Sequence, residues 1–265
     1  MEKISVVIIT FNEENKLPRC IESVKPVADE LIILDSFSTD NTVKIGLKAG
    51  AIVHQQSFHG YKEQKNAALQ LASYNYILSI DADEALSVEL INSIQIAKEK
   101  FMCSAYSMNR CNFFSGRFIR YGLWYPDKKI RLFDKRLAYW GGLNPHDKIV
   151  LNENANTCHL KGDLFHYSFN NVEEYVKRND EISSIAAKSL YKKGQRSGIK
   201  ILVNPVWRFI KSYLIKKGFL DGYPGFIIAK NTAAQAYLKY RKLNKLNRER
   251  KSSLKEPVTV SLSNK

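Results

Sequence analysis

Short apolar runs alternate with amphipathic segments through the first hundred residues. The apolar runs have the length and β-branched composition of buried strands, and they predict strands over residues 4–10, 30–35, 51–54 and 76–80. The segments between them repeat apolar residues at helical spacing, which predicts helices over residues 17–24, 42–49, 62–73 and 87–101. Strands that are apolar throughout and separated by helices indicate an α/β fold, in which a mainly parallel sheet is flanked by helices.

Polar residues precede two of these helices at the positions where caps belong. Residues 12–14 (NEE) can cap the first helix, and Ser87 fits the N-cap of the fourth. A third polar segment, residues 36–41, separates the second strand from its helix and reads as a turn. These caps and turns support the boundaries that the apolar pattern predicts.

The pattern changes beyond residue 101. Residues 101–161 are aromatic, rich in turn formers and dense in arginine, which predicts short antiparallel strands and loops. A helical pattern follows over residues 173–191. We therefore divide the chain into four parts, with boundaries near residues 105, 190 and 250: two halves of one α/β domain, a helical basic extension over 191–250 and a disordered tail over 251–265.

Charge narrows the choice of partners. The 265 residues carry 41 Lys and Arg against 26 Asp and Glu, a formal net charge of +15. This balance implies an anionic partner, which could be a nucleic acid, a phosphorylated substrate or an acidic membrane face. The cations are concentrated in the C-terminal part, where apolar and aromatic residues interleave with Lys and Arg. That mixture predicts a helix in the interface of an anionic membrane, and a packed helix with a solvated basic face is the alternative.

The cysteines and the N-terminus bear on the compartment. Cys20, Cys103, Cys111 and Cys158 are spread along the chain and form no C-x-x-C pair. We expect reduced thiols rather than a disulfide framework or a zinc cluster. The sequence shows neither a signal-peptide layout nor an apolar run long enough for a spanning helix. We expect a cytoplasmic protein, peripheral on the inner face of the cytoplasmic membrane.

Two carboxylates follow the fourth predicted strand directly. Asp81 and Asp83 stand at positions i and i+2 at its exit, so an extended chain points both side chains the same way. Mg²⁺ takes one or two carboxylates and completes its shell with phosphate oxygens and water. Asp-x-Asp also occurs in surface turns, so the position after a buried strand is what indicates a metal held against a diphosphate.

Two other strands end in polar residues. The first ends at Thr10-Phe11-Asn12-Glu13 and the second at Asp35, followed by the polar turn. In parallel sheets, ligands bind beyond the carboxyl ends of the strands, so we expect these exits to share an edge with Asp81. The chain has no G-x-G-x-x-G and no G-x-x-x-x-G-K-[ST], which argues against a standard dinucleotide site and a Walker loop.

Together these segments resemble the family 2 glycosyltransferases of the GT-A fold. The residues that carry the resemblance are VVIITFNE at 6–13, DSFSTDNT at 35–42 and DADE at 81–84. Within the family the chain is most similar to the lipopolysaccharide-core β-glucosyltransferase branch, on KNAA at 65–68, RLF at 131–133, PHD at 145–147, HYS at 166–168, RF at 208–209 and GFLDG at 218–222. The resemblance extends to about Leu243. It implies a GT-A-type, Rossmann-like sheet with a helical basic C-terminal extension.

The resemblance also implies site roles. A nucleotide-sugar donor would bind the first half, residues 1–105, through Thr10, Asn12, Glu13, Asp35, Lys65 and Asp81. The cofactor would be Mg²⁺ or Mn²⁺, held by Asp83 and Asp81. Arg131 and Lys65 would support the charge of the departing diphosphate. The family pattern has two adjacent acids at the second strand exit, whereas Ser36 follows Asp35 here, which leaves the preferred base open.

Residues 106–190 would hold the acceptor and the catalytic base. The related branch carries a His-acid pair, and this chain has His146 and Asp147. Asp147 would take the proton from the acceptor hydroxyl in an inverting transfer. UDP-glucose is the default donor, and the acceptor would be a saccharide or lipid-linked glycan of the cell envelope. We interpret Glu84 and His166 as structural.

Two other functions fit parts of the pattern. A nucleotidyltransferase could also use paired aspartates and a metal, but the Gly- and Arg-rich phosphate loop expected near its N-terminus is absent. A nucleic-acid-binding module would fit the charge of +15, but no RRM, KH or zinc-finger pattern is present. We therefore expect a glycosyltransferase that binds no nucleic acid.

Overall fold

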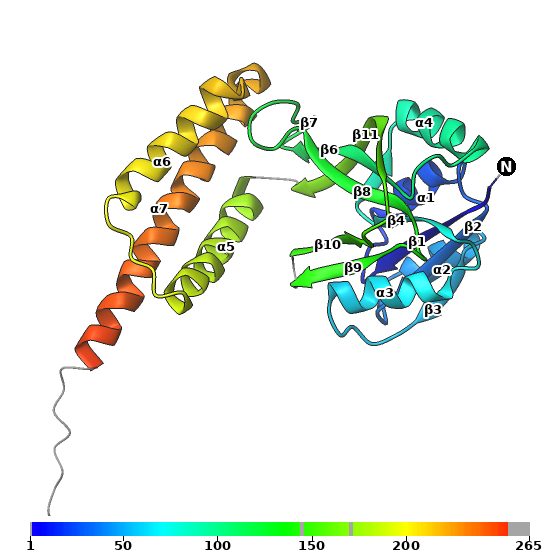
Figure 1. Cartoon of the computed structure of the whole chain (residues 1–265), viewed down its shortest axis with the longest axis horizontal. Helices are drawn as coiled ribbons and strands as arrows, with labels where there is room; N and C mark the ends of the chain where they lie inside the picture. Colours follow the sequence, from blue (N-terminus) through cyan, green and yellow to red (C-terminus); the bar gives the residue numbers. More distant parts are fainter. Residues whose placement is uncertain (1, 144–145, 170–171, 254–265) are drawn as a thin grey trace, which may run out of the picture. The chain divides into compact units, whose positions relative to one another are not determined.

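The computed structural model describes residues 2–143, 146–169 and 172–253. It forms two compact units, one built from Met1–Phe113 with Tyr125–Ser168 and the other from Phe114–Trp124 with Phe169–Lys265 (Figure 1). The predicted boundaries near residues 105, 190 and 250 stay a prediction. The predicted tail begins at 251, where the last helix still continues to Ser253, and the rest of it lies outside the described residues.

The first unit is a mixed sheet flanked by helices (Figure 1). Its strands follow the order β3-β2-β1-β4-β8-β6-β11-β5. They are β1 (Ile4–Thr10), β2 (Glu30–Asp35), β3 (Ile52–Gln55), β4 (Tyr76–Asp81), β5 (Glu84–Leu86), β6 (Ala105–Phe114), β8 (Asp127–Asp134) and β11 (Thr157–Phe169). β1 to β4 are parallel, as predicted, whereas β8 pairs antiparallel with both β4 and β6. The predicted α/β fold is confirmed.

Helices and a small ribbon complete this unit. The helices are α1 (Leu17–Val24), α2 (Thr42–Lys48), α3 (Tyr61–Leu71) and α4 (Val88–Glu99), each within a few residues of its predicted bounds. β9 (Ala138–Leu143) and β10 (His146–Leu151) form an antiparallel ribbon. β7 (Arg117–Phe118) belongs to the second unit. The ribbon contributes to the site because it carries Trp140 and Asp147.

Strand register brings the polar strand exits together. Thr10 pairs with Asp35 across β1 and β2, and Ile9 pairs with Asp81 across β1 and β4. The carboxyl ends of the three parallel strands therefore end at one edge of the sheet, as the sequence predicts. Asp35 and Asp81 lie on either side of the exit of β1.

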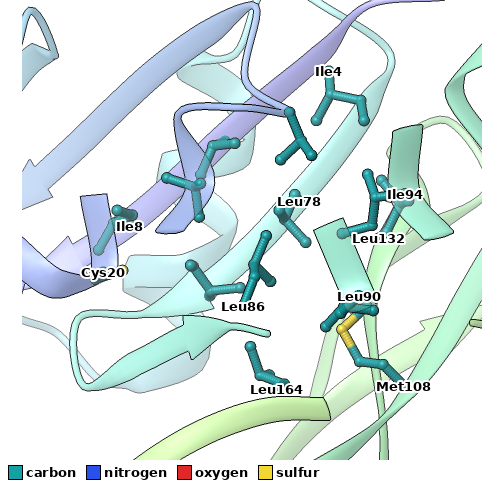
Figure 2. Packing of buried hydrophobic residues seen from close by; sticks show 14 of the residues in the cluster. Ile4, Ile8, Cys20, Leu78, Leu86, Leu90, Ile94, Met108, Leu132 and Leu164 are labelled. Carbon is teal, nitrogen blue, oxygen red and sulfur yellow. The ribbon is translucent and has the colours of Figure 1, made fainter. Parts of the chain in front are cut away.

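Two apolar layers cover the faces of the sheet, because alternate residues of a strand point to opposite faces. On β1, Ile4, Val6 and Ile8 join one cluster with residues of α1 and α4, part of which Figure 2 shows. Val7 points the other way and joins a second cluster with Ala68 of α3 and Trp140 of β9. The second layer is the one that lies under the site.

Two local predictions have opposite outcomes. Ser87 caps α4 as predicted, since its hydroxyl accepts a hydrogen bond from the backbone N–H of Leu90 at 3.2 Å. The predicted cap of α1 by residues 12–14 is wrong, because Lys16 occupies the N-cap without a side-chain hydrogen bond. Asn12 instead takes φ +55°, and its side-chain oxygen accepts from the backbone N–H of Thr39 at 2.8 Å.

The prediction of four reduced thiols is wrong for one pair. Cys103 and Cys158 form a disulfide, with their Cα atoms 5.9 Å apart. They are 55 residues apart in sequence, and the backbone N–H of Ala105 donates to the carbonyl of Asn156 beside them at 3.1 Å. Spacing along the chain gives no sign of such a long-range pair. The cytoplasmic location, which partly rested on reduced thiols, stays a prediction.

The second unit is mainly helical, and the helical character predicted for the basic extension over 191–250 is confirmed. It contains α5 (Val172–Lys192), α6 (Lys200–Ile210), a π turn at Lys211–Ile215, a 3₁₀ turn at Gly218–Asp221 and α7 (Gly222–Ser253). Phe114, Tyr175 and Ile228 form one core cluster, and Ala187, Tyr240 and Leu243 form another. Among the described residues, no helix combines the length and apolar character needed to cross a bilayer.

Candidate active site

Asp81, at the end of β4, lies between two cations. Its Oδ1 is 3.0 Å from Nζ of Lys65 on α3, and its Oδ2 is 3.0 Å from a guanidinium nitrogen of Arg131 on β8. The side chains of Lys65 and Arg131 are buried, whereas that of Asp81 keeps 28% of its surface exposed. Two buried cations thus face the carboxylate at the exit of the central parallel strand.

Glu84 holds the guanidinium of Arg131 in place. Its side chain is fully buried, and its two carboxylate oxygens lie 2.7 and 3.1 Å from Arg131 nitrogens. The backbone N–H of Asp81 also donates to Glu84 at 3.0 Å. A bidentate carboxylate restricts both the position and the plane of a guanidinium. Glu84 therefore fixes the orientation in which Arg131 contacts Asp81.

Trp140 lies beneath both cations. Nζ of Lys65 is 4.2 Å from its ring centroid, and the guanidinium carbon of Arg131 is 5.3 Å from it. The indole N–H donates to the hydroxyl of Ser79 at 3.3 Å, which holds the ring against β4. A cation over an aromatic face is attracted by the ring quadrupole, more so where water is excluded. The ring therefore gives both buried charges a second favourable contact.

Charge pairing decides the ionisation of this cluster. Burial raises the pKa of Asp81, but the charges of Lys65 and Arg131 outweigh burial and hold the pKa of that carboxyl well below its usual range. Burial likewise lowers the pKa of Arg131, and Glu84 and Asp81 more than reverse the effect. The site therefore keeps Asp81 ionised and Arg131 protonated.

Asp147 of β10 joins the same cluster through Lys65. Its Oδ2 lies 3.0 Å from Nζ of Lys65, and its side chain keeps only 8% of its surface exposed. Lys65 therefore bridges Asp147 and Asp81. His146 begins β10, but its side chain lies outside what the structure describes. The predicted role of His146 stays a prediction.

Asp83 faces a histidine on β11. Nε2 of His166 is 3.4 Å from Oδ2 of Asp83, and Nδ1 lies 2.7 Å from the side-chain oxygen of Asn112. The side-chain oxygen of Asn112 can only accept, so a neutral His166 would carry its proton on Nδ1 and its lone pair on Nε2, the nitrogen that faces Asp83. A histidine held through one nitrogen so that the other is free to coordinate is the usual arrangement at metal sites.

These donors fit a divalent cation in part. An imidazole nitrogen and a carboxylate oxygen suit Mn²⁺, and Mg²⁺ prefers oxygen alone. Among the residues that the structure describes, no cluster of three or more His, Cys, Asp or Glu is arranged to hold a metal by itself. Asp83 and His166 could therefore supply two ligands, and a bound diphosphate and water would have to supply the others. Asp81 as a ligand stays a prediction, since both of its oxygens face cations.

Asp35 organises the exit of β2. It is fully buried and accepts hydrogen bonds from the hydroxyl of Thr10 at 2.9 Å, the backbone N–H of Ser38 at 2.8 Å and the amide of Gln55 at 3.2 Å. These contacts fix the turn at Phe37, where φ is +61°. Thr10 and Asp35 thus lie together as predicted, but as a buried pair. Their contact with a nucleotide base stays a prediction.

Asn12 and Glu13 flank this turn. Asn12 is exposed and its backbone N–H donates to the hydroxyl of Ser38 at 2.8 Å. Burial raises the pKa of Glu13, the charge of Lys16 opposes this and the charge of Asp83 adds to it. The carboxylate of Glu13 therefore lies within electrostatic reach of Asp83.

The structure therefore brings together four predicted residues, Lys65, Asp81, Arg131 and Asp147. Sequence reasoning assigned Glu84 and His166 structural roles. Trp140 is buried, and it contacts both cations of the site. The only local signal for Glu84 is its place directly after Asp-x-Asp. His166 lies within β11, and nothing in the sequence indicates that this strand pairs with β5.

Comparison with known proteins assigns the chain to a family. The pattern of the family described as Glycosyl transferase family 2 matches residues 5–152. An uncharacterized glycosyltransferase of Rickettsia typhi is 33% identical over 261 residues, which cover 93% of this chain and 88% of that protein. The lipopolysaccharide core biosynthesis glycosyltransferase LpsC of Rhizobium meliloti is 28% identical, with 91% of each chain covered.

Among solved structures, S. aureus TarS aligns with a TM-score of 0.49 and 16% identity, over 93% of this chain and 91% of that one. The family match spans the strand exits, Lys65, Arg131 and Asp147, and the Rickettsia relative extends over nearly the whole chain. The chain therefore belongs to glycosyl transferase family 2, and it is a glycosyltransferase.

Proposed function

We propose that the protein transfers a hexose, with inversion, from a nucleotide-diphosphate sugar to a saccharide hydroxyl. The observation that carries this proposal is the bridge formed by Lys65 between Asp81 at the exit of β4 and Asp147 on β10. It joins a residue of the donor side to a carboxylate suited to deprotonate an acceptor. Arg131, on the same aspartate, adds a second cation.

Asp147 acts as the base in this mechanism. The acceptor oxygen attacks the anomeric carbon while the bond from that carbon to the diphosphate oxygen breaks, and the hydroxyl proton passes to a carboxylate oxygen of Asp147. Lys65 holds the carboxylate of Asp147 in place through the 3.0 Å contact with its Oδ2. Attack opposite the leaving group inverts the configuration at the anomeric carbon.

Lys65 and Arg131 stabilise the leaving group. Negative charge builds on the diphosphate as the glycosidic bond breaks, and buried cations fixed beforehand stabilise such charge more strongly than water does. Both side chains are already oriented, by Trp140 and by Glu84. Both face the exit of β4, where they pair with Asp81.

A divalent cation would supply further positive charge when bound. Asp83 and His166 would hold it, and it would screen the diphosphate as a Lewis acid. The imidazole nitrogen favours Mn²⁺ over Mg²⁺. The charge of Asp83 helps to raise the pKa of Glu13, so a second carboxylate lies within electrostatic reach of Asp83.

The acceptor is proposed from the relatives. The name of LpsC, which is 28% identical, places that protein in lipopolysaccharide core biosynthesis. We extend this to an acceptor in the cell-envelope glycan, either a saccharide or its lipid-linked form, and take UDP-glucose as the first donor to test. The proposed reaction takes place on the cytoplasmic side of the membrane.

A donor screen tests the proposal. The purified chain is incubated with UDP-, GDP-, ADP- and dTDP-sugars, with and without Mn²⁺, and thermal stabilisation and release of nucleoside diphosphate are measured. We expect one base to stabilise the protein in the presence of Mn²⁺, with slow release of its diphosphate. Release of pyrophosphate from a nucleoside triphosphate would instead indicate a nucleotidyltransferase. Stabilisation by oligonucleotides alone would indicate a nucleic-acid-binding module.

A further inference from the structure

An apolar stripe lies exposed along α6. None of the eleven residues of this helix is buried, although most of them are apolar. The exposed apolar residues of this helix, together with its N-cap Ile199, form what we name the α6 stripe: Ile199, Leu202, Val203, Val206, Trp207 and Ile210. Side chains of this kind are normally covered in a folded protein, and a contiguous exposed group of them marks an interaction surface.

The stripe occupies one side of the helix. Its members recur every three or four residues, so they share a face. Other residues of α6 pack against α7, where the side-chain amide of Asn204 donates to the hydroxyl of Tyr240 at 2.6 Å and the rings of Phe209 and Phe226 lie edge to face, 6.1 Å apart. The helix therefore already has a packed side, and the α6 stripe is what remains.

The apolar surface continues beyond the helix. Leu214 and Ile215 in the π turn, Phe219 and Leu220 in the 3₁₀ turn and Tyr223 at the start of α7 are all exposed. Tyr213 supports this stretch from within, with its ring 6.2 Å from that of Phe219 and 5.8 Å from that of Phe226. The segment that carries these exposed residues is thus held by packed aromatic rings.

The charge of this region has a single sign. Residues 182–220 contain nine Lys and Arg and no Asp or Glu. Asp221, the next acid, is 1% exposed and accepts hydrogen bonds from the backbone N–H groups of Arg120 and Tyr121. Lys200, Lys211 and Lys216 are exposed beside the apolar residues and form no ion pair with any described residue. No exposed acid within this segment offsets them.

We propose that the α6 stripe and its flanking lysines dock the protein on a bilayer that contains anionic lipid. Apolar and aromatic side chains on one face with lysines beside them are suited to the boundary between headgroups and acyl chains. Each Lys or Arg near an anionic leaflet contributes further attraction. A second copy of the chain would bring a like positive charge against the first, and nucleic acid offers phosphates but no apolar layer to cover the stripe.

Vesicle binding of the full chain tests the inference, with Trp207 as an internal reporter. The protein contains three Trp, of which Trp140 is 2% exposed and Trp207 is 52% exposed. We expect the emission to shift to shorter wavelength with vesicles of phosphatidylcholine and phosphatidylglycerol. Vesicles of phosphatidylcholine alone should give a smaller shift, and Trp207→Phe should abolish it. Added salt should weaken binding because it screens the lysines.

Matched double variants separate the stripe from general surface effects. Leu202→Glu with Val206→Glu should weaken vesicle binding by about tenfold or more, since it places two negative charges in the face proposed to enter the bilayer. Val88→Glu with Ile96→Glu, which changes exposed apolar residues of α4, should bind like the wild type. Lys211→Glu with Lys216→Glu should also lose roughly tenfold or more, and Lys44→Glu with Lys48→Glu on α2 should lose far less.

Several outcomes would overturn the inference. The first is a wild-type protein that fails to bind anionic vesicles at low salt, and the second is a stripe variant that binds as well as the α4 variant. A dimer in solution that Leu202→Glu with Val206→Glu converts to a monomer would assign the stripe to self-association instead. Nucleotide-sugar hydrolysis by the stripe variant should match the wild type, so loss of docking and failure of the proposed reaction are distinguishable.

Discussion

The ammonium group of Lys65 lies 3.0 Å from a carboxylate oxygen of Asp147, although 82 positions separate the two residues in the chain. The same ammonium lies 3.0 Å from Asp81. One buried lysine on α3 thus joins the exit of β4 to the β10 ribbon. A cation placed between two carboxylates offsets their mutual repulsion, so Lys65 allows Asp81 and Asp147 to lie close together in one site.

Replacing Lys65 by Met should therefore reduce sugar transfer strongly. Loss of a fixed cation at a developing negative charge costs on the order of 10²-fold in kcat, and here the two carboxylates would also repel each other. The measurement is kcat and KM with the donor found by the screen. Lys62→Met, on the same helix but more exposed, is the control and should retain nearly full activity. Equal activity in the two variants would exclude a role for Lys65.

Glu84 and Arg131 should behave as a coupled pair in unfolding experiments. Removing one partner of a buried ion pair leaves an uncompensated charge and costs about 3–5 kcal/mol. We expect Glu84→Met or Arg131→Met alone to be strongly destabilised, and the double variant to lose much less than the sum of the two. Denaturant titrations of the four proteins give the coupling. Additive losses would show that the two residues act separately.

The sequence predicts the parallel half of the sheet and its polar edge because both have local causes. Apolar runs of strand length define β1, β2 and β4, and their exits carry Thr10, Asp35 and Asp81. Nothing local in the sequence indicates which residue faces Asp83. His166 reaches it because β11 pairs antiparallel with β5, with His166 opposite Glu84, and sequence periodicity does not encode which distant strands pair.

The same limit applies to the caps and the buried acids. Residues 12–14 have the composition of a helix cap, but the hydrogen bonds that Asn12 makes to the Ser38–Thr39 turn, itself held by Asp35, place them elsewhere. Glu84 precedes a helix as an ordinary surface acid would, and only its ion pair with Arg131 of β8, 47 positions away in the chain, makes it part of the site. Tertiary contacts override local propensity at these positions.

Asp29 offers a test of stability against pH. Burial raises its pKa, but hydrogen bonds from the Lys98 ammonium and the backbone N–H of Ile4 lower it below the ordinary value of 3.8. A depressed pKa contributes stability above the ordinary value, and this contribution is lost as pH falls through the lower folded value. Asp29→Asn should thus be less stable than wild type at pH near 7, and the difference should shrink in acid.

The readout for Asp29→Asn is the free energy of unfolding, measured by denaturant titration across a pH series. Glu153→Gln removes an exposed carboxylate of the same unit and should follow the wild-type curve. A gap between Asp29→Asn and wild type that is the same at every pH would attribute the loss to packing rather than to ionisation.

The pair formed by Asp83 and His166 should govern the response to Mn²⁺. Asp83→Asn and His166→Ala each remove one proposed ligand, and Asn112→Ala releases the imidazole that Asn112 holds at 2.7 Å. Loss of such an orienting contact weakens metal affinity by roughly 10–100-fold. Mn²⁺ titrations of donor binding should show this order of effect in all three variants. His159 forms a hydrogen bond with Ser107, and the control variant His159→Ala should leave the titration unchanged.

Asp147→Asn isolates the proton-transfer step. The amide cannot accept the proton of the acceptor hydroxyl, so we expect transfer to fall by about 10²–10⁴-fold, while donor binding in the presence of Mn²⁺ changes little because Asp81, Asp83 and Arg131 remain. Transfer kinetics and donor calorimetry are measured on the same preparations, with Glu153→Gln as the control. If both transfer and binding were lost together, Asp147 would act only by placing Lys65, and full transfer would exclude Asp147 as the base.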